Sequence, residues 1–391
     1  MSLIAAATAL AGAIAVSDAY AQIQPLDIPI VYLGKAAEHP PTLSNFDPIP
    51  EDQGLQGARL GVKDNATTGK FLKHAYSISE VEKQAGDDIL PDAKAALAGG
   101  PKIAILNMPR TDLLAVADLP EAADDLLFNA GAADVDLRDK DCRKNVLHTL
   151  PSRDMLADGL MQFLIKRQWT DIFLIVGHYP TDKALGDAFR SAATKFNVNI
   201  VIEKQWLENA DIRRNAMQEV PLFTQGDDYD VVVVADEEEQ FGTFFQYNTW
   251  IPRPVMGSDG LIVAGWSPVM EQWAAIQLQE RFQKFADRKM NSVDYAAWLG
   301  ARTIGEAVTR TKSNDLKIIR EFILSEQFTL DGFKGSRLSY RTWNGQLRQP
   351  IPLASEDALV TLTPLEGFLH QRTELDTLGL DEPESQCKAM E

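Results

Sequence analysis

The chain has 391 residues, of which 45% are hydrophobic and 24% are charged, a composition that excludes disordered and fibrous proteins. Acidic residues outnumber basic ones by 56 to 38, and the formal net charge is −18. This charge argues against binding to nucleic acid or to an anionic membrane, because both favour positively charged proteins. With two cysteines and five histidines, a multi-cysteine zinc or iron–sulfur site within one chain is excluded.

The first 21 residues are predicted to be a signal peptide. Residues 3–16 are small and apolar, but the run is shorter than the about 20 residues that span a bilayer. It is followed by Ala19-Tyr20-Ala21, the small-x-small pattern after which signal peptidase cleaves. No basic residue precedes the run, and a buried helix is the alternative. We expect cleavage near Ala21, a periplasmic location and no other membrane-spanning segment.

The predicted export affects how the two cysteines of the chain, Cys142 and Cys387, are interpreted. An oxidising compartment favours a disulfide between them, which would tie the C-terminal tail to the body of the protein. In the loop-entropy model, closing so long a loop stabilises the fold by about 4–5 kcal/mol. The alternative is a pair of separate buried thiols.

Strands and helices alternate along the rest of the chain. Continuous apolar runs predict buried strands, and apolar residues spaced three and four apart predict amphipathic helices. The expected elements are strand 28–33, helix 56–65, strands 102–106 and 126–129, helix 154–168, strand 172–176, helix 182–196, and strands 199–202 and 230–235. A helical stretch over 268–324 and a turn-rich region from 327 follow. The alternation is typical of parallel α/β sheets.

The length fits two or three domains, or one two-lobed domain, at about 150 residues per domain. The α/β units form two successive runs that join near 149–151. The acidic run 236–239 follows a predicted strand, and we interpret it as a solvated loop and helix start.

Sequence motifs for catalysis are absent. The chain contains no G-x-G-x-x-G or G-x-x-x-x-G-K-[ST] phosphate loop, no G-x-S-x-G turn and no H-E-x-x-H. Its five histidines are scattered, and no two have the i, i+4 spacing of a helical metal site. The sequence therefore predicts a protein that is not an enzyme and that holds no metal.

Two segments carry a resemblance to a known family. From Phe328 to Tyr340 an F-x-G-x-x-G-like turn precedes a strand, and 296–301 is an alanine-rich helical run. With a predicted leader and two α/β runs, the chain resembles type I periplasmic substrate-binding proteins of ABC transporters, of the branched-chain amino-acid-binding kind. The resemblance implies a two-lobed α/β fold, each lobe a parallel sheet flanked by helices, with hinge crossovers. It assigns 22–149 and about 268–325 to the N-terminal lobe, and 150–267 and about 326–391 to the C-terminal lobe and tail.

Several further runs resemble the subfamily associated with alcohol dehydrogenases that depend on pyrroloquinoline quinone (PQQ). These runs are 56–61, 64–69, 137–143, 145–148, 252–255, 277–282 and 347–350. The resemblance implies a monomer that captures PQQ or a related compound between the lobes and delivers it to an ABC transporter permease, with no catalytic cofactor. The alternatives are a PQQ carrier or chaperone for a quinoprotein alcohol dehydrogenase, a branched-chain amino-acid-binding protein, and an enzyme acting on a periplasmic small molecule.

PQQ is a planar quinone with three carboxylates, so its site requires aromatic faces and cations. Trp266 is the first stacking candidate, because it lies where the chain should cross between lobes. Lys35 ends the first predicted strand, where the wider family has small hydroxyl residues, and this favours a larger anion. The other expected ligand-binding residues are Trp250, Trp298, Arg138, Lys140, Arg143 and Lys144. For the tryptophans the alternative is core or hinge packing, and for the 137–144 run it is a solvated charged helix start.

Overall fold

The computed structural model describes residues 25–41, 48–207 and 212–390. The predicted signal peptide and its cleavage site lie outside these residues. Within the described part of the chain, no helix has the length and apolar character that crossing a membrane would require. The short 3-10 helices are η1 (Pro120–Ala122), η2 (Val135–Arg138), η3 (Gly242–Phe244), η4 (Gln272–Ala274) and η5 (Glu374–Thr377).

The first half of the chain forms a parallel five-stranded sheet. In spatial order its strands are β2 (His74–Lys83), β1 (Leu26–Lys35), β3 (Ile103–Asn107), β4 (Leu126–Asn129) and β5 (Val146–His148). Alternate residues of β1 enter two different cores, because successive side chains of a strand point to opposite faces. Ile30 and Tyr32 pack in one core, and Val31 and Leu33 in the other.

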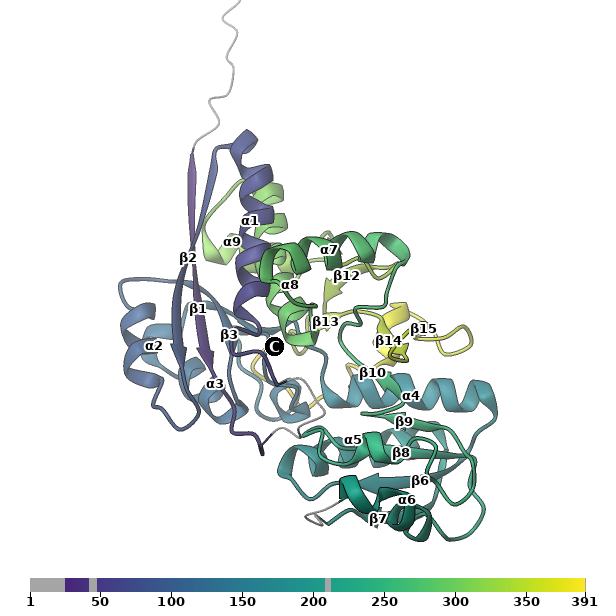
Figure 1. Ribbon diagram of the computed structural model, residues 1–391. Helices are drawn as coiled ribbons and strands as arrows, with labels where there is room; N and C mark the ends of the chain where they lie inside the picture. The colour runs from purple at the N-terminus through teal and green to yellow at the C-terminus, as the bar shows by residue number, and fades with distance from the viewer. Residues whose placement is uncertain (1–24, 42–47, 208–211, 391) are drawn as a thin grey trace, which may run out of the picture.

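Helices cover both faces of this sheet (Figure 1). The helices on one face are α1 (Leu55–Leu72), α7 (Ala275–Ala286), α8 (Ser292–Thr311) and α9 (Leu316–Ile323), and those on the other are α2 (Leu90–Leu97) and α3 (Arg110–Ala117). Helix α1 packs very closely on α8 at Gly57, where a Cβ atom would lie 1.9 Å from the carbonyl oxygen of Asp294. Glycine is therefore required at this contact. We call the five-stranded sheet with these helices the first lobe.

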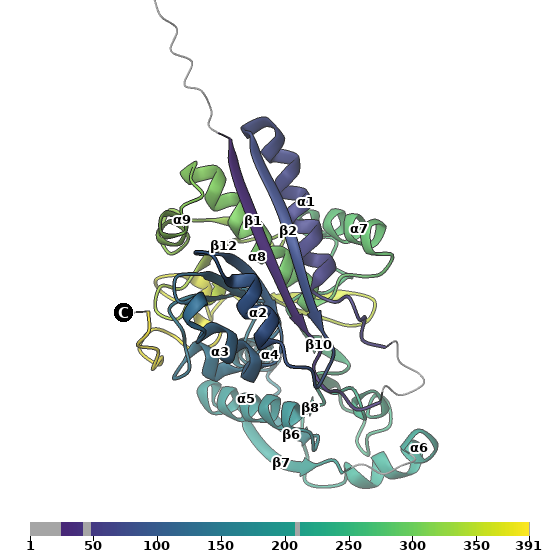
Figure 2. The ribbon, with the colours of Figure 1, turned by 90° about the vertical axis from the view of Figure 1, so that its left-hand side faces the viewer.

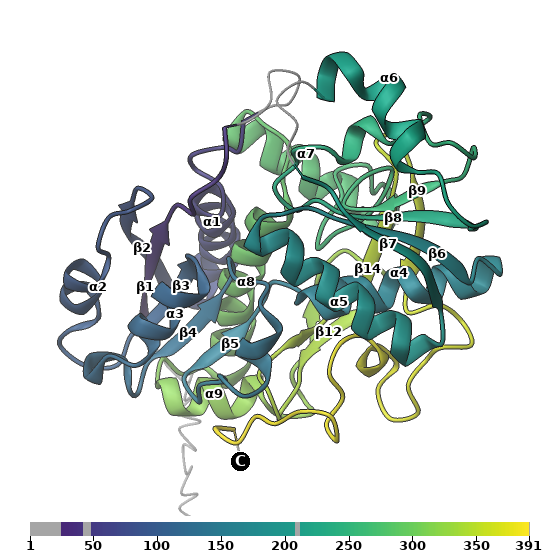
Figure 3. The same cartoon turned by 90° about the horizontal axis from the view of Figure 1, so that it is seen from below.

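A seven-stranded sheet lies in the other half of the molecule (Figure 3). In spatial order its strands are β15 (Leu359–Thr363), β14 (Ile351–Ala354), β10 (Leu261–Val263), β9 (Val255–Gly257), β8 (Val231–Ala235), β6 (Asp171–Val176) and β7 (Asn199–Gln205). The strands β10, β9, β8, β6 and β7 are parallel to one another, whereas β14 pairs antiparallel with both β10 and β15. Its helices are α4 (Arg153–Arg167), α5 (Pro180–Phe196) and α6 (Ile212–Phe223). We call this unit the second lobe.

In the described part of the chain, three segments that lie between strands cross from one lobe to the other. The crossings are 149–152, after β5, 264–274, after β10, and 349–350, before β14. A small antiparallel sheet precedes the third crossing, with strands β11 (Leu330–Asp331), β12 (Arg337–Tyr340) and β13 (Leu347–Arg348). Leu330, Leu338 and Leu347 of this sheet pack in a core of the first lobe.

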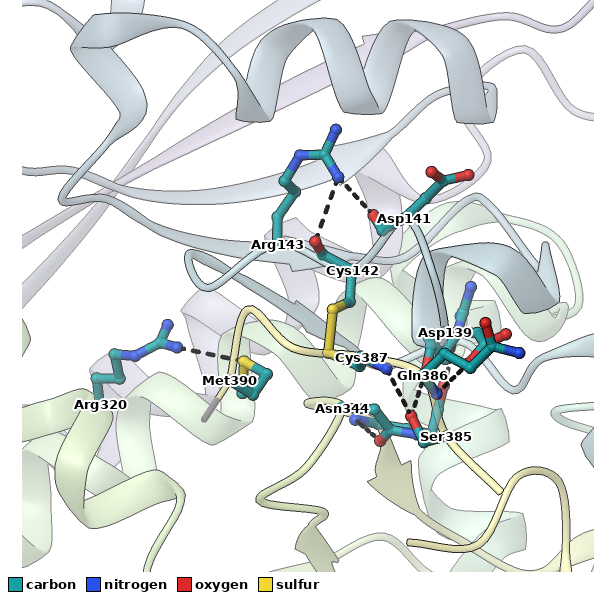
Figure 4. Close-up of a disulfide and its surroundings, with 12 residues drawn as sticks. Asp139, Asp141, Cys142, Arg143, Arg320, Asn344, Ser385, Gln386, Cys387 and Met390 are labelled. Atoms are coloured by element: carbon teal, nitrogen blue, oxygen red, sulfur yellow. Dashed lines mark hydrogen bonds between the residues drawn. A yellow bond between two sulfur atoms is a disulfide. The ribbon is translucent and has the colours of Figure 1, made fainter. Parts of the chain in front are cut away.

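The α/β class and the two sheets flanked by helices that the sequence predicted are confirmed. Each expected strand is present within a few residues, and the stretch expected to be helical over 268–324 holds α7, α8 and α9. The Cys142–Cys387 disulfide is also confirmed, with an S–S distance of 2.07 Å (Figure 4). The antiparallel β14 and β15 differ from the expected all-parallel sheet.

Candidate functional site

The carboxyl ends of the parallel strands of both lobes face each other. Parallel strands end at one edge of a sheet, and ligands of open α/β sheets bind at that edge. His39, which follows β1, and Glu238, which follows β8, meet between the lobes, with Nδ1 and Oε2 2.8 Å apart. A pocket opens at this contact, lined by His39, Pro40, Ile49, Glu237, Glu238, Glu239 and Gln240.

The second-lobe wall of the pocket is the acidic loop after β8. Asp236 is fully buried and accepts hydrogen bonds from the backbone N–H groups of Gln240, Phe241 and Gly242, at 2.9, 2.7 and 2.6 Å. These bonds fold the loop back on itself. The acidic run is therefore partly a buried, ordered turn at the interlobe contact, which differs from the solvated loop that the sequence suggested.

Two further carboxyls surround this turn. Burial, followed by the neighbouring Asp236, raises the pKa of Asp182 to about 6. Burial, followed by Asp236 and Glu239, raises the pKa of Asp259 to about 7. Asp182 accepts hydrogen bonds from the N–H groups of Tyr179 and Glu238, both at 3.2 Å. Asp182, Asp236 and Asp259 lie close together, so their carboxylates repel one another when they are ionised. A positively charged partner nearby would lower this repulsion.

Arg153 bridges the two lobes next to the pocket. Its side chain is 7% exposed, and its Nε and Nη2 atoms lie 2.6 and 2.7 Å from the Glu237 carboxylate. Nη1 lies 3.6 Å from Asp134, in the first-lobe loop after β4. Such a bidentate pair is a strong, directional contact, and it fixes the acidic loop against the start of α4.

The His39–Glu238 contact should weaken as the pH rises. The hydrogen bond to Glu238, together with the charges of Glu237 and Glu239, raises the pKa of His39 above its usual value. A raised histidine pKa means that the stabilisation is complete at about pH 6 and is lost as the pH rises through the folded-state pKa. Without ligand, small-angle scattering should therefore show a larger radius of gyration at about pH 9 than at about pH 6.

His39→Gln should remove most of this pH dependence. The charged groups that face His39 and Glu238 from neighbouring elements are Glu237, Glu239 and Arg153. An equal pH-dependent expansion in the His39→Gln variant would assign the effect instead to Asp182 and Asp259, whose pKa values are raised to about 6 and about 7.

Of the three tryptophans predicted to stack on a ligand, Trp266 and Trp298 both stack on Tyr295 in the first-lobe core, and Trp250 lies elsewhere. Trp266 is 2% exposed, and its ring stacks on Tyr295 at 4.5 Å between centroids, with Nε1 donating to Gln279. Trp298 is also buried, and its Nε1 donates to Asp64 at 3.0 Å. Both pack in the first-lobe core, whereas Trp250 is exposed on the second lobe.

Arg138 is one of the most enclosed charged residues of the first lobe. It is 2% exposed, and its guanidinium donates to Gln346 and to the backbone carbonyls of Ala132, Asp134 and Leu150 at 2.8–2.9 Å. Burial lowers its pKa to about 10. In this conformation its donors hold the first interlobe crossing in place.

The other predicted cations lie near carboxylates or on the surface of the first lobe. Their ion pairs are Lys35 with Asp112 at 2.8 Å, Lys140 with Asp136 at 3.1 Å, and Arg143 with Asp118 at 2.5 Å. Lys144 is exposed. Lys35 is the last residue of β1 and therefore lies at the carboxyl edge of the first-lobe sheet.

Sequence reasoning missed His39, Arg153 and the carboxyls of the second-lobe wall. A usable signal existed for Asp236, because it directly follows the predicted strand 230–235. Arg153 offered no such signal, since its partners are distant in sequence.

No protein-family model matches the sequence, and no curated protein matches it. Solved structures do match the fold over almost their whole length. One is a branched-chain amino acid ABC transporter periplasmic ligand-binding protein from Burkholderia xenovorans, with a TM-score of 0.68 and 13% identity, covering 93% of this chain and 100% of that one.

Two others are a leucine-, isoleucine-, valine-, threonine- and alanine-binding protein from Brucella ovis and a solute-binding protein from R. palustris in complex with benzoate. The first has a TM-score of 0.64 and 15% identity, covering 93% of this chain and 98% of that one. The second has a TM-score of 0.61 and 10% identity, covering 92% and 99%. At these identities the likeness is one of fold, and the chain has the fold of type I periplasmic binding proteins.

Proposed function

We propose that the protein is a solute-binding protein of an ABC transporter, which captures a small molecule between its lobes and presents it to a membrane permease without altering it chemically. The observation that carries the proposal is the arrangement of the strand ends, which face each other across a pocket between two lobes joined by three crossings. A ligand that contacts both lobes favours the closed form through those contacts.

The moving units are the two lobes, and the export predicted from the first 21 residues would place them in the periplasm. We propose that 22–149 and about 268–325 move as one unit, and that 150–267 moves as the other together with the part of 326–391 that packs on it, from β14 to Gly379. Residues 328–347 are expected to move with the first unit, because their apolar side chains pack in its core.

PQQ or a related compound is the ligand that the sequence resemblance favours. A trianion would require several cations at the pocket, and the candidates near the strand ends are Lys35, Arg153 and His39. Each of them lies against a carboxylate: Asp112, Glu237 and Glu238, respectively. PQQ binding therefore requires that the ligand displace at least one of these carboxylates.

A ligand with an ammonium group is the second candidate, and the carboxyls of the second-lobe wall favour it. Asp182, Asp236 and Asp259 crowd together after β6, β8 and β9. A cationic group in the pocket would lie next to Glu237, Glu238 and Glu239, which line it, and would lower the repulsion among the acidic residues of this wall. Amino acids appear in the names of two of the structural neighbours, which supports their inclusion in the test.

Titration with PQQ and with leucine should separate the two candidates. We expect one of them to bind at about micromolar concentration, and the radius of gyration to fall on saturation. PQQ binding should also shift its visible absorption. Binding without contraction would contradict lobe closure, and failure of both ligands would contradict both candidates.

The carrier for a quinoprotein alcohol dehydrogenase remains the alternative role if PQQ binds. Uptake of the ligand should be lost in a permease deletion if the protein serves a transporter. Activation of the apo-dehydrogenase by the loaded protein, with uptake unchanged, would instead support the carrier.

A further inference from the structure

The C-terminal segment 365–390 runs from the second lobe to the first. At its beginning it is anchored on α4, where the backbone N–H of Leu365 donates to Gln162 at 3.0 Å. Further on, Leu378 packs in the second-lobe core, and the N–H of Gly379 donates to the buried Asp158 at 2.7 Å. Lys195 of α5 completes this anchor, since its ammonium lies 2.9 Å from both the Asp158 carboxylate and the Gly379 carbonyl.

The middle of the segment is held from the hairpin between β12 and β13. Arg341 is 1% exposed, and its Nε lies 2.9 Å from Asp376, which also accepts from Arg348 at 2.7 Å. The remaining Arg341 donors reach the backbone carbonyls of Leu375, Leu378 and Leu380. The hairpin belongs to the small sheet whose residues pack in the first-lobe core.

The far end of the segment is fixed on the first lobe, where the disulfide joins Cys387 to Cys142 (Figure 4). Ser385 donates to the Arg138 carbonyl at 3.3 Å. Met390 packs against the first-lobe core, and its sulfur lies 3.5 Å from the Arg320 guanidinium. Both cysteines are buried, with 7% and 6% exposure.

We propose that residues 375–387 act as a strap that couples the two lobes and limits how far they move relative to each other. The anchor at Asp158 holds one end to the second lobe, and the disulfide holds the other end to the first lobe. Eight residue steps separate Gly379 from Cys387, so the strap can extend to about 29 Å at most. The covalent bond also keeps the tail's contacts at a high effective concentration when any one of them opens.

The strap lies away from the mouth of the pocket. Figure 2 shows the C-terminus and the chain that follows β1 on opposite sides of the molecule. The His39–Glu238 contact and the strap thus link the lobes at two separate places. Ligand exchange requires the lobes to separate on the side of the pocket. Because the strap joins the lobes on the other side, it limits how far they can separate. This proposal rests on the two-lobed fold and not on the identity of the ligand.

Interlobe distances in the full chain test the proposal. Spin labels carried by non-natural amino acids at the exposed Ala95 of α2 and Lys183 of α5 report on the separation of the lobes without adding cysteines. We expect a narrow distance distribution in the oxidised wild type and a distribution roughly twice as broad in the Cys142→Ser, Cys387→Ser double variant. Treatment of the wild type with a dithiol, which reduces the bond to two thiols and is itself oxidised to a disulfide, should broaden it likewise under mild denaturation.

A second variant keeps the test decisive if the double variant folds poorly. A chain that ends after Leu380 and carries Cys142→Ser retains the Arg341 and Asp158 anchors but has no link to position 142. It should show the same broadening. A lower melting temperature with an unchanged distance distribution in both variants would overturn the strap and leave the disulfide as a stabilising bond only.

Discussion

Replacing Lys334 with methionine should cost more stability at about pH 9 than at about pH 7. Lys334 is 1% exposed, and burial lowers the pKa of its ammonium well below the usual value. The unfolded chain then binds one more proton than the folded chain, so wild-type stability rises with pH until an exposed lysine titrates. The methionine variant lacks this rise.

Lys334 matters because the three interlobe crossings meet at its side chain. Its side-chain nitrogen lies within hydrogen-bonding distance of the Gly265 carbonyl in the second crossing, and of Gln349 Oε1 and the Pro350 carbonyl in the third, the latter two at 2.8 and 3.2 Å. Gln349 in turn donates to the Thr149 carbonyl of the first crossing at 2.8 Å. Methionine leaves these buried acceptors without their donor, which costs about 1–3 kcal/mol for each unsatisfied group.

Urea unfolding at the two pH values measures the effect, and Lys144→Met, at an exposed lysine of the same lobe, is the matched control. The pH should stay below about 9.5, where tyrosine ionisation does not interfere. Burial raises the pKa of Tyr32 and Tyr340, so these groups would destabilise the fold only at still higher pH. A loss of equal size at both pH values would mean that Lys334 is charged in the folded chain as well as in the unfolded chain, and would contradict the prediction.

The sequence predicted β8 from its apolar run and missed β2, in which polar and apolar residues alternate. All five residues of β8 are buried, and its uninterrupted apolar run revealed it. In β2, polar and apolar residues alternate and most side chains are at least partly exposed, because β2 is an edge strand. A search for a period of two would have found it.

The helices α7, α8 and α9 appeared as one stretch because their ends lack the usual signal. Helix α7 ends at Asp287 and α8 at Lys312, both in the left-handed conformation that glycine normally supplies. The sequence therefore offered no glycine at either boundary. The starts of α8 and α9 do carry a local signal, because the side chains of Asn291 and Asp315 accept hydrogen bonds from the first backbone N–H groups.

The sequence was sufficient to predict the disulfide but not the contacts of the residues proposed for the ligand site. Two cysteines allow only one pairing, so predicting the Cys142–Cys387 disulfide required only the inference that the protein is exported to an oxidising compartment. The role of Arg138 depended on carbonyls of three separate residues and on Gln346, 208 positions away. The spacing of residues in the sequence carries no information about such distant partners. From the sequence alone, an arginine in a charged run can be interpreted either as a ligand contact or as a solvated side chain.

Asp259→Asn should stabilise the protein at about pH 8 and have little effect at about pH 5. Burial and the neighbouring Asp236 and Glu239 raise the pKa of Asp259 to about 7, above the about 3.9 of an unfolded aspartate. The folded form then binds the extra proton, so the stability that this carboxyl contributes is complete below about pH 4 and is lost as the pH rises through 7. Asparagine is neutral throughout and avoids the loss.

The expected gain is about 1–2 kcal/mol at pH 8, less than the roughly 4 kcal/mol of the full shift, because the side chain is partly exposed and solvent screens it. Thermal unfolding at both pH values measures it, with Asp124→Asn at an exposed position as the control. The same variant separates the two ligand candidates. An ammonium ligand should bind Asp259→Asn about tenfold more weakly, since it loses an ionic partner, whereas a trianion should bind equally or more tightly. A variant that gains no stability at pH 8 would show that Asp259 is not held in the crowded acidic turn, and the argument for a cationic ligand would fail with it.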